Sequence, residues 1–431
     1  MFAKKFYSLC LIVALSCSSL SLLANSWRIL FYMDSSDSLS DMAFKNITDM
    51  VRGKPNDSIE LFIQLHAYYN AGLRYRVTNQ GLVFLEEVTL TGNNKQDFID
   101  AASWGFSGNN ADHTMMIMSN HGWGILDPRW NEQTQKYEVD SDQLATSCTA
   151  KRSALAHHQQ RHKGYMFNHT TKTYLTNDDL ISGLNTIKDE VLSGQQIDIV
   201  AFDTCMGAML EVAYQVAPFA RYMVGSQSCS LPDGFDYQGI TTVLNQENNT
   251  PLDVAAGMVN AFDDYYTRHD DSGIYTHTAF DLNRVDDVRI ALNLLIEQVL
   301  NLPDYTNILN TVRDASPRFC MWPMYTDTME FFTILGNQLA PSEESDQVTA
   351  VMQAIEILRN AHATMIVARC GGSATHGMAH GSAIYCPFNR IDSSYNQTLF
   401  AGSCQWINLL QAMCTDQTGD SLTAWSVGNA S

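Results

Sequence analysis

Short apolar runs alternate with helix-like stretches over the first half of the chain, and this alternation constrains the fold more than any other feature. Apolar runs that lack polar alternation are typical of strands buried on both faces of a parallel sheet, and such strands are joined by helices. Residues 39–51 show the helical signal, because their apolar side chains follow the three- and four-residue spacing of a helix face. The pattern therefore predicts an α/β fold with a mostly parallel sheet covered by helices on both faces. The predicted strands are 28–33, 59–65, 73–77, 82–88, 113–119, 197–202 and 222–226.

The pattern changes near residue 250, where longer helical stretches begin. Before that point, residues 127–177 show no apolar period until Thr173, and a loop of this length is usually functional or processed. We therefore predict a signal peptide (1–24), a sheet domain (25–250) and a largely helical C-terminal region (251–431) that packs on the sheet domain. The elements predicted after residue 250 are helices at 252–266, 285–302 and 347–362 and short strands at 276–282 and 382–387.

The first residues of the chain indicate its compartment. Lys4 and Lys5 precede an apolar run at 9–15, and a second apolar stretch ends at Ala24. This is the pattern of a secretory signal peptide cleaved near Ala24, and a lipoprotein signal that uses Cys17 is the weaker alternative. Interrupting serines make the segment too broken for a membrane anchor. We expect a secreted or periplasmic protein without a membrane span, in a compartment that permits disulfides.

Charge narrows the range of partners. The chain has 46 Asp and Glu residues against 26 Lys and Arg residues, a formal net charge of −20. A surface this acidic repels phosphate backbones, so the composition excludes nucleic acid as a partner and favours basic or cationic partners.

A histidine and a cysteine follow two of the predicted strands. One strand runs into His121, and another runs into Cys205. Active sites of open parallel sheets form beyond the carboxyl ends of the strands, so these side chains are placed to meet. A Cys–His pair performs acyl transfer because the imidazole accepts the thiol proton and later protonates the leaving amine. From these residues alone, a core cysteine and an ordinary loop histidine remain open as structural alternatives.

Neighbouring residues add to the expected chemistry. Cys205 precedes a helical stretch predicted to start near Gly207, and a helix N-terminus there would lower the pKa of the thiol. The backbone N–H groups of Gly122 and Cys205 are candidate donors to an oxyanion. Strand alternation places Asp203 on the same side as Cys205, where its carboxylate is a candidate binder of a cationic substrate group.

In these residues the chain resembles the clostripain-like cysteine peptidases, a branch of the caspase-like clan. The resemblance covers roughly residues 27–240 and is most specific around Cys205. It implies a caspase-like catalytic domain at 25–250, a His121–Cys205 dyad, and Asp203 at the base of a pocket that selects Arg or Lys before the cut bond. The resemblance thus predicts a secreted cysteine endopeptidase that acts on peptides and proteins. The matching segments are 27–33 with Asp37 and Leu39, 120–124, 174–176, 198–207 with 211–213, 224–227 and 232–237, with 382–387 as the best later fragment.

The resemblance also implies proteolytic processing. Members of this family are commonly processed between the histidine and cysteine motifs, where this acidic chain carries a basic cluster within the long loop. A loop with Arg and Lys is a good substrate for an enzyme that prefers those residues, so we expect self-cleavage. The two fragments are expected to stay associated, because both contribute strands to one sheet. The candidate sites are Lys151, Arg152, Arg161 and Lys163.

Two other functions remain open from the sequence. One is a non-catalytic protein that binds basic peptides on a caspase-like scaffold. The other is a zinc hydrolase built on His376 and His380, although flanking glycines argue against the helix that this spacing requires. We predict no metal site and no cofactor, and the sequence leaves a calcium requirement undecided. Cys229 stands where family members usually have no cysteine, and a bond to Cys205 would make the enzyme latent until reduced.

Overall fold

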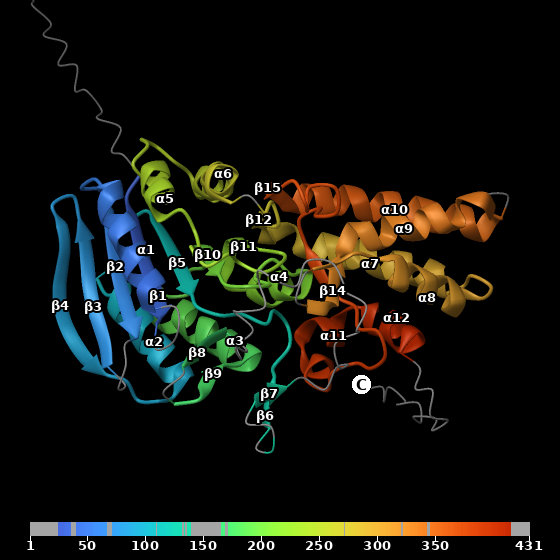
Figure 1. Ribbon diagram of the computed structural model, residues 1–431, viewed down its shortest axis with the longest axis horizontal. Coiled ribbons are helices and arrows are strands. Elements are labelled where there is room, and N and C mark those ends of the chain that lie inside the picture. The colour runs from blue at the N-terminus through green and yellow to red at the C-terminus, as the bar shows by residue number, and fades with distance from the viewer. Residues whose placement is uncertain are drawn as a thin grey trace, which may run out of the picture.

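The computed structural model describes residues 25–35, 40–66, 71–108, 110–131, 133, 136–138, 165–168, 171–270, 272–319, 322–342 and 345–414. Figure 1 shows a twisted sheet with its blue strands at one end of the molecule and a bundle of orange and red helices at the other end. Among the described residues, no helix combines the length and the apolar character needed to cross a bilayer.

Nine strands form the central sheet, in the order β15-β12-β11-β10-β5-β1-β2-β3-β4. The five central strands are parallel, an antiparallel hairpin extends one edge, and two antiparallel strands extend the other. This confirms the predicted α/β class and its mostly parallel sheet. The bounds are β1 (Trp27–Asp34), β2 (Ile59–His66), β3 (Ala71–Thr78), β4 (Gly81–Thr89), β5 (His113–Ser119), β10 (Ile197–Asp203), β11 (Ala220–Gly225), β12 (Thr276–Asp281) and β15 (Ile366–Gly371).

The chain changes direction across the sheet next to β1. It moves outward from β1 to β2 on one side, and it later returns to place β5 and then β10 on the other side. In open α/β sheets, ligand sites form beyond the carboxyl ends of strands at such a switch point. The loops after β5 and β10 begin there, which positions the site described below.

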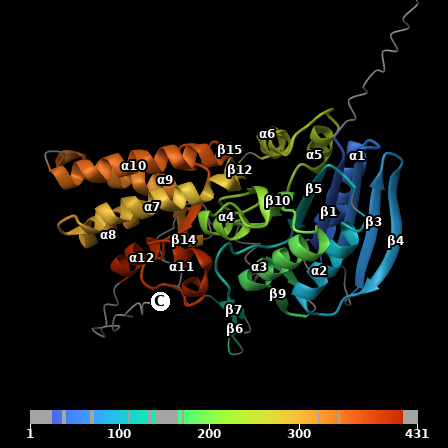
Figure 2. The ribbon, with the colours of Figure 1, turned by 180° about the vertical axis from the view of Figure 1, so that it is seen from behind.

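Helices cover both faces of the sheet, and the strands supply apolar side chains to each face in turn. Within β1, Leu30 and Tyr32 face one core, whereas Ile29 and Phe31 face the other. Successive side chains point to opposite faces, and both faces pack against a core. Apolar residues are therefore needed at every position, which is why these strands appear in the sequence as unbroken apolar runs. Figures 1 and 2 show the two helical layers from opposite sides. The first layer contains α2 (Asn94–Gly105), α3 (Asn177–Thr186) and α4 (Leu210–Val216), and the second contains α1 (Ser40–Gly53), α5 (Tyr237–Leu244) and α6 (Pro251–His269).

The C-terminal region shares one core with the sheet. Phe202 of β10, Leu295 and Leu358 belong to the same buried cluster, so the helices after β12 continue the first layer. Both ribbon views place these helices beyond β12, at the end of the molecule opposite β4. The region contains α7 (Val285–Leu300), α8 (Tyr305–Ala315), α9 (Thr328–Leu339), α10 (Asp346–Met365), α11 (Leu399–Ser403) and α12 (Trp406–Met413), with a small sheet of β13 (Arg318–Phe319), β14 (Trp322–Asp327) and β16 (Ala383–Tyr385).

Two parts of the chain differ from the pattern predicted for them. Residues after 250 add β12 and β15 to the central sheet, so the sheet continues across the predicted boundary. The predicted loop at 127–177 contains two short hairpins, β6 (Arg129–Asn131) with β7 (Lys136–Glu138) and β8 (Tyr165–Asn168) with β9 (Thr173–Leu175). Strands of three or four residues are too short for a period of two to stand out from the sequence. Short helical turns complete the structure: η2 (Ile187–Val191), η3 (Leu282–Arg284), η4 (Ala340–Ser342) and η5 (Tyr395–Gln397).

Candidate active site

The structure brings His121, Gly122 and Cys205 together at one edge of the sheet. β5 pairs with β10 in parallel, and Ser119 opposite Asp203 is their last paired position, two residues before His121 and Cys205 respectively. The following loops touch, because a Cβ built on Gly122 would lie 2.5 Å from the carbonyl oxygen of Cys205. Any side chain at position 122 would therefore push the two loops apart, which explains the glycine.

Asn120 fixes the loop that carries His121. Its buried side-chain amide donates to the carbonyl oxygen of Asp34 at 2.7 Å, and its side-chain oxygen accepts from the backbone N–H of Phe167 at 2.9 Å. The loop is thus tied to the end of β1 and to β8. Sequence reasoning did not assign this role, because an amide between a strand and a histidine does not reveal its partners.

The loop after β10 differs from its prediction. α4 begins at Leu210, so the expected helix start near Gly207, with its effect on the Cys205 thiol, is wrong. Residues 206–208 pair instead with the segment after β11: the N–H of Met206 donates to the oxygen of Ser228 at 3.0 Å, and the N–H of Ala208 donates to the oxygen of Ser226 at 2.9 Å. Met206 has a φ of 58°, a conformation uncommon outside glycine, which turns the chain sharply just after Cys205.

The pKa of Cys205 is lowered by a different neighbour. The largest cause is a hydrogen bond with the thiol of Cys229, and the backbone N–H of Ser230 acts in the same direction, against burial and the Asp203 carboxylate. By contrast, burial raises the pKa of Cys370 and raises that of Cys404 to about 12. The half-buried Cys205 is thus shifted toward the thiolate, which is the nucleophilic form of cysteine.

Asp203 lies buried beneath this loop, with 4% of its surface exposed. Its carboxylate accepts hydrogen bonds from the hydroxyls of Tyr237 at 2.5 Å, Ser119 at 3.2 Å and Ser230 at 3.4 Å, and from the backbone N–H of Phe235. Burial raises its pKa, and these donors oppose that rise. The sequence argument considered this carboxylate only as a binder of a substrate cation, and the structure surrounds it with donors from the protein itself.

Gln227 connects the active-site loops to the C-terminal region. Its side-chain amide donates to the buried carboxylate of Asp327 at 2.8 Å, and its side-chain oxygen accepts from the N–H of Gly381 at 3.0 Å. Gln227 lies between Ser226 and Ser228, whose carbonyl oxygens accept the bonds from the loop after Cys205. The position of that loop therefore depends on residues more than a hundred positions later in the chain.

Two further bonds hold the loops of the candidate site from the same side. The hydroxyl of Tyr325 donates to the carbonyl oxygen of Trp123 at 2.6 Å, and the N–H of Ala383 donates to the oxygen of Ala208 at 2.9 Å. The small sheet that contains β14 and β16 thus supports the loop after β5 and the loop after β10. Sequence reasoning missed this arrangement because it links segments that carry no shared motif.

Glu211 is a fully buried carboxyl at the start of α4. One oxygen accepts from the N–H of Tyr385 at 2.8 Å and from the hydroxyl of Tyr395 at 3.3 Å, and its other oxygen has no hydrogen-bond partner within the described part of the chain. Burial raises the pKa of this carboxyl from 4.5 to about 7. The folded protein therefore holds a proton here that the unfolded chain releases at lower pH.

We expect this carboxyl to make folding stability fall as pH rises. Between its unfolded pKa of 4.5 and its folded pKa of about 7, the folded state binds more protons than the unfolded state, so the free energy of unfolding decreases through that window. The full effect is about 3 kcal/mol, from roughly 1.4 kcal/mol per pKa unit. Urea unfolding at pH 5 and pH 8 measures it, and Glu211→Gln should lose most of the drop. The exposed Glu356→Gln is the matched control, and equal drops in all three proteins would contradict the assignment.

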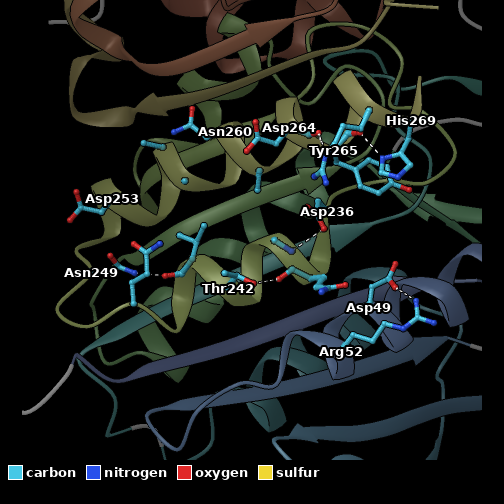
Figure 3. Close-up of a pocket in the computed structure, with 18 of the residues that line it drawn as sticks. Asp49, Arg52, Asp236, Thr242, Asn249, Asp253, Asn260, Asp264, Tyr265 and His269 are labelled. Carbon is cyan, nitrogen blue, oxygen red and sulfur yellow. Dashed lines mark hydrogen bonds and ion pairs between the residues drawn. The ribbon is translucent and has the colours of Figure 1, made fainter. Parts of the chain in front are cut away.

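A large polar depression, about 810 Å³ in volume, lies apart from this site. Figure 3 shows its walls, formed by α1, α5 and α6, with the ion pair of Arg52 and Asp49 at 2.8 Å on one side. None of the candidate catalytic residues lines it. This depression is therefore separate from the candidate site.

The remaining candidates from the sequence are placed as follows. Within the described residues, no cluster of three or more His, Cys, Asp or Glu side chains is arranged to hold a metal ion, and Nε2 of His380 lies 3.0 Å from the carboxylate of Glu330. The candidate self-cleavage sites lie outside the described residues: Lys151, Arg152, Arg161 and Lys163.

Comparison with known proteins identifies the family and the fold of this chain. The model of the clostripain family matches residues 131–413, roughly two thirds of the chain, starting after His121. No curated protein matches the sequence. The fold is similar to a secreted cysteine protease of Bacteroides thetaiotaomicron called iotapain, with a TM-score of 0.64 and 13% identity over 88% of this chain and 99% of that one. It is also similar to an inactive protease zymogen of Parabacteroides distasonis, with a TM-score of 0.58 and 15% identity over 91% and 99%.

These findings confirm the caspase-like fold expected from the resemblance. The structural neighbours are aligned along nearly their whole length, so the C-terminal helices belong to the shared fold. Because the family model covers well over half of the sequence, the chain belongs to the clostripain family and is a cysteine peptidase.

Proposed function

We propose that the protein is an exported cysteine endopeptidase that cleaves after Arg or Lys, with a His121–Cys205 dyad. The observation that carries the proposal is the register of β5 and β10, which ends both strands at one level and sets the two loops in contact at Gly122 and Cys205. The pKa of the Cys205 thiol is lowered, and acyl transfer requires such a thiol together with an imidazole, the role proposed for His121.

In the proposed reaction, the Cys205 thiolate attacks the carbonyl carbon of the scissile bond. The backbone N–H groups of Gly122 and Cys205 would hold the resulting oxyanion. The His121 imidazolium then protonates the leaving amine, which departs and leaves a thioester on Cys205. Neutral His121 next takes a proton from water, and the hydroxide attacks the thioester and releases the acid and the thiol.

Asp203 is the proposed source of specificity. It is buried two residues before the proposed nucleophile, and four hydrogen-bond donors around it partly offset the effect of burial, which raises its pKa. A carboxylate beneath the site would attract an Arg or Lys side chain and reject an apolar one.

The proposal of export rests on the N-terminal pattern. Residues 1–24 lie outside the described residues, and their charged start and apolar run are the support for a signal peptide. The similar protease iotapain is described as secreted, which agrees with this compartment.

Paired peptide substrates test the proposed function. Peptides that differ only in having Arg, Lys or Leu before a reporter group should be cleaved by the reduced protein, with kcat/KM at least ~100-fold higher for Arg and Lys than for Leu. Iodoacetamide should block all cleavage and should label Cys205. Equal rates on the three peptides would overturn the specificity, and a reduced protein that cleaves none of them would overturn the peptidase assignment of this site.

We also propose that the enzyme cuts its own chain between the two catalytic motifs. The expected cuts follow Lys151, Arg152, Arg161 or Lys163, and β8 and β9 beyond them stay bound to the folded body. Mass spectrometry of purified wild type should show two associated fragments, and Cys205→Ala should remain one chain. Cleavage that persists in the alanine variant would point to another protease, and an uncut, fully active wild type would contradict the proposal. The similar zymogen from Parabacteroides distasonis, described as inactive, is consistent with activation by processing.

A further inference from the structure

Cys205 and Cys229 lie opposite each other in a short antiparallel pairing of two loops. Met206 bonds to Ser228, and Ala208 bonds to Ser226, so the next position outward in the same register pairs 205 with 229. These two backbone bonds hold the loop after Cys205 against the segment that carries Cys229. A disulfide requires two cysteines whose Cα atoms lie about 4.4–6.8 Å apart, so it can form only between segments held this closely.

The two sulfur atoms are also in contact. The thiol of Cys229 hydrogen-bonds with the sulfur of Cys205, and no disulfide joins the two residues in this structure. The two thiols are therefore neighbours in the fold.

The surrounding structure holds this geometry from both sides. The backbone N–H groups of Gln227 and Ser228 donate to the hydroxyl of Thr276, at 3.1 Å and 3.2 Å. These bonds fix the segment after β11, which carries Cys229. Gln227 in turn is bound to Asp327 and Gly381. A covalent bond formed here would leave the fold in place and would be open to reversal by a reductant.

We propose that Cys205 and Cys229 form a dithiol site that closes into a disulfide on reaction with a low-molecular-weight disulfide, and that the closed form is a latent peptidase. The loss of activity rests on the proposed function, because it follows from Cys205 being the nucleophile. The formation of the bond does not depend on that function.

The exchange balances in two steps. The Cys205 thiolate attacks one sulfur of the small disulfide, forms a mixed disulfide and releases one thiolate. Cys229 loses its proton and attacks the Cys205 sulfur, which forms the intramolecular bond and releases the second thiolate. The protein loses two hydrogen atoms, the small disulfide is reduced to two thiols, and an added dithiol reverses both steps.

Local chemistry favours this pair over other thiols of the described chain. The lowered pKa of Cys205 raises the fraction of attacking thiolate, whereas burial keeps Cys370 and Cys404 protonated. If the protein is exported as proposed, it would also meet the oxidising conditions in which disulfides persist.

The test treats the full-length protein, first reduced, with oxidised glutathione and follows both mass and activity. Wild type should lose about 2 Da, yield a peptide that links 205 to 229, and lose activity at least ~100-fold. Dithiothreitol should restore all three. Cys370→Ser is the control and should behave as wild type.

Two variants of Cys229 separate bond formation from hydrogen bonding. Cys229→Ser keeps a donor beside Cys205, and Cys229→Ala removes it. Both should fail to lose mass and should instead accumulate glutathione on Cys205. The pH at which iodoacetamide labels Cys205 at half its maximal rate should rise in the alanine variant and stay near the wild-type value in the serine variant.

The outcomes distinguish the two proposals. Oxidised wild type without the 205–229 link, or a linked form that still cleaves peptides, would overturn the latent disulfide. A linked wild type whose reduced form cleaves no peptide would leave the dithiol site standing and would overturn the peptidase assignment of Cys205.

Discussion

Cys205→Ala is expected to lower kcat/KM for peptide cleavage by at least ~1,000-fold, because it removes the group that forms the acyl-enzyme. Loss of a nucleophile in comparable hydrolases costs about 10⁶-fold in kcat, and the remaining site retains a small residual rate. The change from a thiol to a methyl group is small, and Cys205 is only half-buried, so the fold should be retained. Peptide assays with the Arg substrate, together with urea unfolding of both proteins, measure the two expectations.

Cys370→Ala is the matched control for this experiment. Cys370 is also a half-buried free thiol, but it lies on the edge strand β15, and burial raises its pKa. The control variant should keep wild-type activity and the same sensitivity to iodoacetamide. An alanine variant at position 205 that retained more than a few per cent of activity would remove Cys205 from the role of nucleophile.

Asp203→Asn is expected to reduce cleavage after Arg and Lys by roughly 30- to 5,000-fold, the equivalent of about 2–5 kcal/mol for a lost buried partner. Cleavage after Leu should change far less, because an apolar side chain gains nothing from the charge. The rate at which iodoacetamide labels Cys205 should also stay within a few-fold of wild type, since alkylation does not use the specificity pocket.

Asp198→Asn controls for the loss of a buried carboxylate from the same strand. Asp198 lies at the opposite end of β10, where it pairs with Arg221 at 3.1 Å. This variant should leave the ratio of Arg to Leu cleavage unchanged. The donors around Asp203 allow a different result, in which Asp203→Asn loses Arg cleavage, Leu cleavage and thiol labelling equally. That result would mean that Asp203 supports the structure of the loop and does not recognise the substrate side chain.

The sequence predicted the elements whose side chains face a core on both sides. β1, β5 and β10 were recognised because nearly every residue in them is buried. β15 was missed because it follows α10 without a break, lies at the sheet edge, and is mostly half-buried, so it lacks an unbroken apolar run. The start of α4 was predicted too early because residues 206–209, which are methionine, glycine and alanine, look like the beginning of a helix. Their pairing with the segment after β11 produces no pattern that can be recognised in the sequence.

Only part of the candidate site could be predicted from the sequence. His121 and Cys205 could be placed together because each follows a predicted strand, and parallel neighbours end at one edge. The role of Cys229 as the donor that lowers the Cys205 pKa could not be derived, because it depends on the register between two loops. The supporting bonds from Tyr325 and Gly381 are even harder to predict from the sequence. Their partners are a backbone oxygen and one glutamine side chain, and neither belongs to a recognisable motif.

The bonds that hold the candidate active-site loops come from residues near the end of the chain, and the order of synthesis gives this a consequence. A ribosome completes His121 and Cys205 long before it reaches Tyr325, Asp327 and Gly381, which hold the loops of both residues. Nascent domains fold from the N-terminal side as the chain emerges, so the five parallel strands can pair while these bonds are still missing. The growing chain therefore carries a thiol and an imidazole whose loops are not yet held in place. Under the proposed dyad, an active peptidase would form only when the polypeptide is almost complete.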